Sequence, residues 1–85
     1  MLVATTYRIT DSGGEYTTIE RRSAMDKPEK WAVCNLGDVL NKNGVWEYEP
    51  QPSSRSDEFI ECTRFDTVKE AYEAWISWKK ANDKT

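Results

Sequence analysis

Histidine is absent from this chain of 85 residues, and cysteine occurs only at Cys34 and Cys62. Without histidine there is no Ser-His-Asp triad, no Cys-His nucleophile pair and no histidine-based zinc site. Two cysteines alone cannot complete a structural zinc site. The Gly13-Gly14 pair lacks the spacing and the following helix of a phosphate-binding loop. We therefore expect a protein that is not an enzyme and that uses no metal or other cofactor.

Long apolar runs are also missing. No stretch approaches the ~18–20 residues that span a bilayer. Residues 1–10 lack the basic region and the apolar segment of a secretory signal. Cys34 and Cys62 form no CxxC arrangement, and thiols stay reduced in the cytoplasm. We therefore expect a cytoplasmic protein with no membrane contact and with two free, half-buried thiols.

A basic patch is the third feature that the sequence lacks. The chain has 12 basic and 15 acidic residues, a formal net charge of −3. A general nucleic-acid binder presents a basic patch or stripe, so general nucleic-acid binding is not expected. Acidic residues gather instead around the middle of the chain, where they form either a solvated face or a complement to a basic protein surface. These residues are Glu47, Glu49, Asp57, Glu58 and Glu61.

What the chain does have is aromatic residues: four Trp, four Tyr and two Phe. Each ring buries roughly 150–250 Å², so a few of them organise the core of a small domain. We expect one domain over residues 1–85, with most of the rings in its core. Aromatic residues are also enriched at interfaces, and some of the ten are candidates for contact with a partner.

Hydrophobic alternation with a period of two predicts strands over about 3–10, 16–22, 31–36, 45–49 and 59–65. Residues 11–14 and the Asn43-Gly44 pair are turn signals between strands. Residues 37–40 stay unassigned, as a continuation of the third strand after a bulge or as a short turn. The expected fold is α+β, with a four- to five-stranded antiparallel sheet and one C-terminal helix packed on one face.

The helix is predicted over about 67–82, where the period of the pattern changes. Thr67 and Glu70 have the spacing of a capping box, in which each of the two side chains accepts a hydrogen bond from the backbone amide of the other residue. The apolar residues that follow recur at helical spacing and form one broad face. This face consists of Val68, Ala71, Tyr72, Trp75, Ile76 and Trp78.

The segment from Trp46 to Phe65 gives the strongest indication of a binding surface. Pro50 and Pro52 have no amide donor and a fixed φ, so the chain should leave the sheet there as a polar loop. Binding residues are often carried by loops on a rigid scaffold. We place the partner-binding residues on this loop and its flanks, at Trp46, Tyr48, Arg55, Asp57 and Glu58.

A purely structural interpretation stays open for several of these side chains. Arg55 suits a carboxylate or phosphate of a partner, and it equally suits a local ion pair with Asp57 or Glu58. Glu47 and Glu49 leave the same face of a strand, where we interpret them as solvent-facing rather than as a catalytic pair.

The block from Trp46 to Phe65 and the helix opening DTVKEAYEAW, from Asp66 to Trp75, resemble the short accessory proteins of tailed bacteriophages and prophages. The resemblance covers most of the chain and is one of overall design, without a defining motif. It implies a non-catalytic protein of the host-takeover or anti-defence type. Such a protein binds a host or phage protein and inhibits or modulates it, and CRISPR effectors are among the targets. The place of action would be the bacterial host cytoplasm.

Other functions stay open at this point. A small-molecule or nucleotide sequestering or sensing module would line a pocket with aromatic residues from the sheet and the helix. Ligand excess would then stabilise it, whereas a binding module gains stability only from its macromolecule. A homodimer is compatible with the pattern, because an exposed edge strand can pair with its copy. A structural protein of a virion would assemble into rings or tubes.

Overall fold

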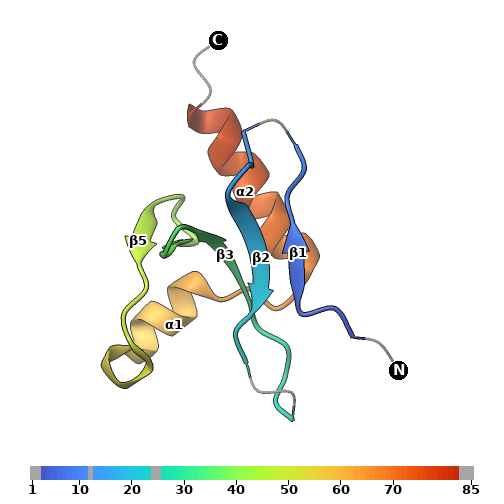
Figure 1. The fold of residues 1–85 in the computed structure, drawn as a ribbon. Coiled ribbons are helices and arrows are strands. Elements are labelled where there is room, and N and C mark those ends of the chain that lie inside the picture. The colour runs from blue at the N-terminus through green and yellow to red at the C-terminus, as the bar shows by residue number, and fades with distance from the viewer. Residues whose placement is uncertain (1–2, 12, 24–25, 83–85) are drawn as a thin grey trace.

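The computed structural model describes residues 3–11, 13–23 and 26–82 of the chain, so Ser12 of the predicted first turn lies outside the described residues. Figure 1 shows strands side by side, with one helix behind them and the other near the last strand. The elements in chain order are β1 (Thr6–Arg8), β2 (Thr17–Arg21), β3 (Trp31–Asn35), β4 (Asp38–Leu40), β5 (Trp46–Tyr48), the 3-10 helix η1 (Pro52–Ser54), α1 (Asp57–Thr63) and α2 (Val68–Asn82).

Each strand pairs antiparallel with the next one along the chain, so the sheet has the order β1-β2-β3-β4-β5. The open antiparallel sheet that alternation predicted is therefore confirmed. The strands expected at 3–10 and 45–49 shorten to three residues each. Residues 37–40, which the sequence left unassigned, contribute β4 after a turn formed by Leu36 and Gly37.

One face of the sheet, called the helix face here, packs under α2 and holds the main core. Its side chains include Ile19, Val33 and Leu40, which cluster with Ala71 and Trp75 of α2. Trp75 is the largest side chain that is fully buried, at 1 % exposure. One side of α2 therefore packs against the strands, as the helical spacing predicted, although Tyr72 of the predicted face is exposed.

The start of α2 follows the predicted capping box with one change. Thr67 Oγ1 accepts a hydrogen bond from the amide of Glu70 at 3.0 Å, as expected. The Glu70 carboxylate accepts from the amide of Asp66 at 3.2 Å, one residue before the expected donor. Lys79 and Lys80 lie in the last turn, where positive charge complements the helix dipole.

The fifth strand expected at 59–65 is wrong, because residues 57–63 form α1. Ser56 caps this helix: its Oγ accepts a hydrogen bond from the amide of Phe59 at 3.0 Å. Two acidic residues in the first turn add to the cap by complementing the helix dipole. Only Phe65 keeps strand character, through a single bridge to β3. The described residues thus form two α-helices where the sequence predicted one.

The opposite face of the sheet, called the open face, carries Thr18 and Glu20 of β2 and Cys34 of β3. The pairing of Thr18 with Cys34 shows that these side chains share a side. Helix α1 covers only one end of this face, where Phe59 packs against a small cluster that includes Cys34 and Val39. No helix of residues 3–11, 13–23 and 26–82 covers the rest of the open face, and a candidate site lies there.

Candidate functional site

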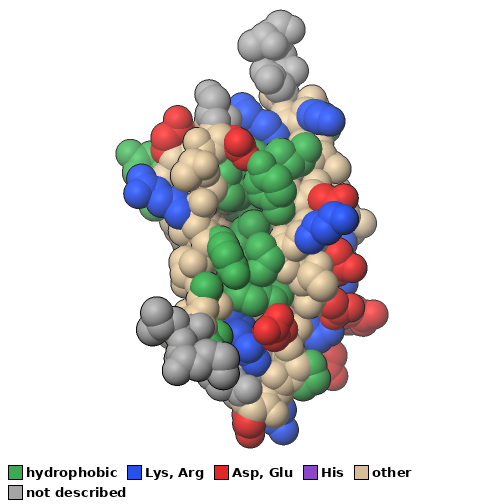
Figure 2. Space-filling view, turned by 90° about the vertical axis from the view of Figure 1, so that its right-hand side faces the viewer, with side chains coloured by type: hydrophobic (Ala, Val, Ile, Leu, Met, Phe, Trp, Pro, Cys, Tyr) green, Lys and Arg blue, Asp and Glu red, His purple; other side chains and the backbone are tan. Residues whose placement is uncertain are grey.

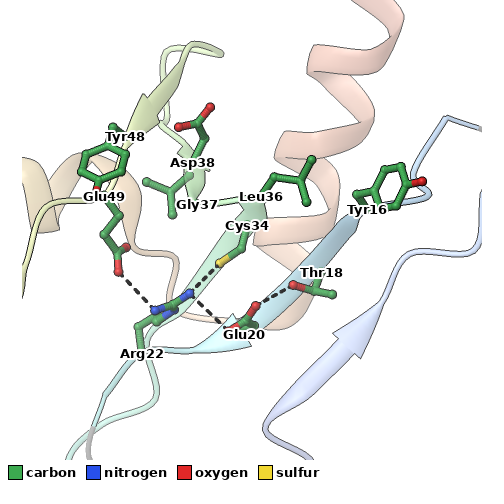
Figure 3. A pocket seen from close by; sticks show the side chains of 11 residues that line it. Tyr16, Thr18, Glu20, Arg22, Cys34, Leu36, Gly37, Asp38, Tyr48 and Glu49 are labelled. Carbon is green, nitrogen blue, oxygen red and sulfur yellow. Dashed lines mark hydrogen bonds and ion pairs between the residues drawn. The ribbon is translucent and has the colours of Figure 1, made fainter.

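The open face is hollowed by about 370 Å³ next to the end that α1 covers. The floor of this open-face hollow is polar. It is formed by Thr18, Glu20 and Arg22 on β2 and just after it, by Cys34 on β3, and by Glu49 just after β5. Figure 3 shows these side chains converging from strands that are separate in the sequence. Alternation along β2 is the local reason, because it sends every second side chain to this face.

Three large side chains stand at the rim of the hollow. Tyr16 precedes β2, Leu36 lies in the turn between β3 and β4, and Tyr48 ends β5. Their exposed fractions are 71 %, 80 % and 74 % respectively. Figure 3 shows the two tyrosines on opposite sides of the hollow with Leu36 between them. Exposed aromatic and aliphatic groups that gather around a polar floor are typical of a protein-binding surface.

The carboxylate of Glu49 is the centre of the ion pairs in the floor. The Glu49 side chain is 8 % exposed, and three guanidinium groups surround it. Arg22 Nη1 and Arg55 Nη2 lie 3.2 Å and 2.8 Å from its Oε2, and Arg64 Nη2 lies 2.8 Å from its Oε1. The expectation that Glu49 faces solvent is wrong, because these arginines cover it. We call this group, Glu49 with Arg22, Arg55 and Arg64, the Glu49 cluster.

The two oxygens of Glu49 are bound differently. Oε2 accepts directed hydrogen bonds from Arg22 and Arg55. Oε1 is buried and receives no hydrogen bond from the described residues, although the Arg64 guanidinium is at ion-pair distance. Attraction between charges depends on distance rather than on the direction of an N–H bond. Arg64 therefore neutralises Oε1, while its Nη1 donates a hydrogen bond to Thr63 Oγ1 at 3.1 Å.

A chain of polar contacts runs from the cluster across the open face. Arg22 Nη2 donates to Cys34 Sγ at 3.2 Å and lies 3.2 Å from Glu20 Oε1. Thr18 Oγ1 donates to the other oxygen of Glu20 at 2.7 Å. These bonds fix Arg22 and Glu20 in the floor, so the hollow keeps a defined arrangement of charge.

Two groups in this chain have displaced pKa values. Burial raises the pKa of the Cys34 thiol above 9.0, against the opposing effect of Arg22. Burial alone would lower the pKa of Arg22, but its hydrogen bond to Cys34 and the charges of Cys34, Glu49 and Glu20 raise it overall. At neutral pH the floor thus holds a protonated thiol beside a charged guanidinium.

The structure places the predicted partner-binding residues at different depths. Tyr48 stands at the rim of the open-face hollow. Trp46 is half-buried and meets Trp78 of α2 edge-on, with ring centroids 5.4 Å apart. Trp46 therefore supports β5 from the helix face instead of offering its ring to solvent.

The other three predicted residues lie around the loop after β5. Arg55 is held by Glu49 and also donates from Nε to the carbonyl of Pro50 at 3.1 Å. The local ion pair that the sequence left open is thus made with Glu49 and not with Asp57 or Glu58. Those two carboxylates are exposed in the first turn of α1, outside the lining of the hollow.

Sequence reasoning missed Tyr16, Arg22 and Leu36 as parts of the site. Tyr16 and Arg22 are the first and last residues of the strand predicted over 16–22. The alternation in that strand already placed them on one face, with polar residues between them. Their approach to Glu49 and Tyr48 depends on the order of strands, which alternation does not specify. A turn at Leu36 could have been predicted, because the next residue is glycine and a short turn was one of the two interpretations of residues 37–40.

A second hollow, of about 430 Å³, lies between β1 and α2. Its apolar lining comes from Tyr7, Ile9 and Ile19 of the sheet side and from Val68 and Tyr72 of the helix. Figure 2 looks at this side of the molecule and shows a band of hydrophobic side chains between flanking charged ones. Tyr7 from the sheet and Tyr72 from the helix thus line the same hollow.

Among the described residues, no group of three or more His, Cys, Asp or Glu side chains is arranged to hold a metal ion. No helix in the described part of the chain is long and apolar enough to cross a membrane. No protein-family model, no curated protein and no solved structure matches this sequence. Function is therefore inferred from the open-face hollow, its rim and its floor.

Proposed function

We propose that this protein is a non-catalytic binding module that docks the open-face hollow and its rim onto a larger protein. By occupying that surface it inhibits or modulates the partner. In line with the resemblance to phage accessory proteins, the partner is a host protein in the bacterial cytoplasm, such as a component of a defence system. The single observation that carries the proposal is the conformation and exposure of Leu36.

Leu36 is the only non-glycine residue in the described chain with a positive φ, at 49°. With Gly37 at φ 94° it forms a two-residue hairpin turn of the I′ type. A left-handed conformation costs an ordinary L-residue roughly 1–2 kcal/mol, and Asn or Gly normally takes this position. Leu36 recovers little of that cost by burial, because its side chain is 80 % exposed. A strained residue that the fold does not need points to a role outside the fold.

The turn between β4 and β5 serves as a comparison, because its residue types suit its backbone conformation. There Asn41 Oδ1 accepts hydrogen bonds from the amides of Asn43 and Val45 at 2.9 Å and 3.0 Å. Gly44 takes the positive φ of 80°. Every residue type in that turn matches its conformation, whereas Leu36 in the neighbouring turn does not. The difference supports a binding role for Leu36, next to Tyr48 from the predicted set.

The test begins with affinity purification of the tagged protein from a lysate of a phage-susceptible bacterium. The partner is then purified and the complex reconstituted. The decisive variant is Leu36→Asn, because asparagine suits the turn and should raise the free energy of unfolding by about 1 kcal/mol, or roughly 4–8 °C in Tm. We expect this more stable variant to lose most of its affinity, since an exposed apolar anchor is replaced by a polar group.

The matched control is Val45→Asn, which makes the same kind of change at an exposed residue outside the hollow. It should leave affinity unchanged. The double variant Asp57→Lys with Glu58→Lys asks whether the acidic turn of α1 also touches the partner. A reconstituted complex that binds Leu36→Asn as tightly as the parent chain would contradict the proposal.

A second candidate function is favoured by the hollow between β1 and α2, which Tyr7 and Tyr72 both line. It is a small-molecule or nucleotide sequestering or sensing module. In that case a metabolite or nucleotide in excess raises the Tm of the isolated protein, and Tyr72→Phe or Tyr7→Ala removes the effect. Leu36→Asn would leave such stabilisation intact, so the two functions are separable with the same variants.

A further inference from the structure

We propose that two copies of this chain pair through the outer edges of their β1 strands, so that the two sheets join into one antiparallel sheet about a two-fold axis. The surface involved contributes no residue of β1 to the open-face hollow and lies outside the proposed function. Three observations support the pairing: the free backbone groups of β1, the contrast with the other edge of the sheet, and the fit of the β1 segment to its own copy.

Alternate residues of β1 direct their backbone groups away from the sheet. The carbonyl of Thr5 and the amide of Ile9 bond to β2, at 2.9 Å and 3.2 Å. In an antiparallel ladder the residues between such bonded positions point their amides and carbonyls to the opposite side. Thr6 and Arg8 therefore face outward, where no described strand pairs with β1, as Figure 1 shows. Such a row of free donors and acceptors is a template for one further strand.

The other edge of the sheet, at β5, is protected against such pairing. The amide of Glu49 bonds back to the turn before β4 at 3.3 Å, so the next outward position is residue 50. Residue 50 is Pro50, which has no amide to donate. Residues 3–10 around β1 contain no proline and only one charge, Arg8. Since prolines and charges are the usual protection of an edge strand, β1 is the edge that is left open to a partner strand.

The β1 segment fits its own copy. In an antiparallel pairing centred on Tyr7, the outward groups of Thr6 meet those of Arg8 from the other copy, and residues 3–11 overlap along their whole length. Tyr7 lies on the helix face, because it pairs with Ile19 of the core. The two Tyr7 side chains would stand directly opposite each other there, and aromatic cross-strand pairs stabilise a sheet.

The side chains beside the edge favour the same pairing. The hollow between β1 and α2 lies along this edge, and its lining includes the exposed Tyr7 and Tyr72. Figure 2 shows the hydrophobic band on this side. A two-fold axis through the sheet keeps both helix faces on one side, so the two bands approach each other across the axis. Charge is compatible as well, because Arg8 lies opposite Thr6 of the copy and in the same cross-strand row as its Glu20.

Such a dimer leaves the open-face hollow accessible. The same symmetry places both open faces on the other side of the joined sheet, so two hollows are presented in one direction. A partner with two matching sites would then be bound with higher avidity than by a single chain. Binding at one hollow does not need the dimer, so the outcome of the Leu36→Asn test is independent of it.

The first test measures the mass of the full chain by sedimentation equilibrium from micromolar to millimolar concentration. We expect the mass to rise to twice that of one chain and the Tm to rise with concentration. Thr6→Pro removes an outward amide and keeps the bonds to β2. It should weaken association by about tenfold, because each copy loses one hydrogen bond. Tyr48→Pro is the matched change at an outward position of β5 and should leave association unchanged.

The second test locates the axis and does not depend on Thr6→Pro. Tyr7→Cys sets two thiols opposite each other with Cα atoms about 4.5 Å apart, which suits a disulfide. Mild oxidation should link this variant into dimers, whereas Arg8→Cys and the parent chain with Cys34 and Cys62 should stay largely unlinked.

Three results would overturn the inference. One is a chain that stays monomeric at every concentration, which would leave the β1 edge to a strand of another protein. The others are a dimer that the folded Thr6→Pro variant forms equally well, and a dimer that cross-links no better through Tyr7→Cys than through Arg8→Cys.

Discussion

The two faces of the sheet are built on different principles. The helix face is closed by α2 and held by apolar contact, with Trp75 at its centre among Ile19, Val33 and Leu40. The open face is held mainly by charge, through the Glu49 cluster, with a small apolar patch under Phe59 at one end. A domain of 85 residues has few apolar groups to bury, and the contrast shows that it concentrates them on one side. The other side carries exposed side chains instead, among them Tyr16, Leu36 and Tyr48.

The largest effect should come from the helix face. Trp75→Ala removes the largest fully buried side chain, and truncation of a buried tryptophan costs about 3–5 kcal/mol. Urea denaturation followed by circular dichroism measures this loss. Tyr48→Ala at the exposed rim is the matched change and should stay within about 0.5 kcal/mol. If the two variants lost similar stability, α2 would not be the element that holds the core.

The next effect tests whether charge really stabilises the open face. Glu49→Gln removes the one carboxylate shared by three arginines, and a buried cation without its counter-charge destabilises by about 3 kcal/mol. Glu47→Gln, two residues earlier on β5, gives up only the carboxylate that accepts from Asn41 Nδ2 at 2.8 Å. It should cost less than about 1 kcal/mol. Equal costs in denaturant unfolding would show that the Glu49 cluster does not stabilise the open face.

The smallest expected effect is the change of stability at alkaline pH, to which one titrating group near each face contributes. Burial raises the pKa of Cys34 on the open face above 9.0. The hydrogen bond that Tyr72 donates to Asp11, beside the helix face, raises the pKa of that phenol above 10.0. In both cases the folded chain holds the proton more tightly than the unfolded chain, so the free energy of unfolding falls as pH rises through these values.

We therefore expect a Tm that is level below about pH 9 and declines above it. Tyr72→Phe should keep the first part of the decline, which belongs to Cys34, and reduce the part above 10.0. Scanning calorimetry across this pH range checks both parts. A parent chain whose Tm rises with pH there would reverse the sign and contradict the assignment.

Features set by neighbouring residues could be predicted from the sequence. The capping bond from the Glu70 amide to Thr67, the strand alternation around Ile19 and the turn at Asn43-Gly44 all depend on short spacings. The helix α1 was missed because Phe59 and Phe65 end a stretch whose alternation imitates a strand. Its cap was nevertheless local, since Ser56 lies three residues before the amide that it accepts from.

The site was harder to predict because its partners are distant along the chain. Arg22 and Glu49 are separated by 27 positions and meet only after the three strand pairings from β2 to β5 have formed. Nothing within the segment around Glu49 reveals that three arginines will cover it. Tyr48 was identified because aromatic residues beside a proline-rich loop indicate a surface, whereas Tyr16 reaches the same hollow from the other end of the sheet.

The Glu49 cluster has a consequence for local opening. Arg22 follows β2, Arg55 belongs to the loop after η1, and Arg64 follows α1, yet all three contact one carboxylate. If the segment that carries Glu49 detached, all three guanidinium groups would lose their counter-charge at once. Amide hydrogen exchange in the three segments should therefore proceed through one common opening event, in which the loop and the edge of the sheet open as a single unit.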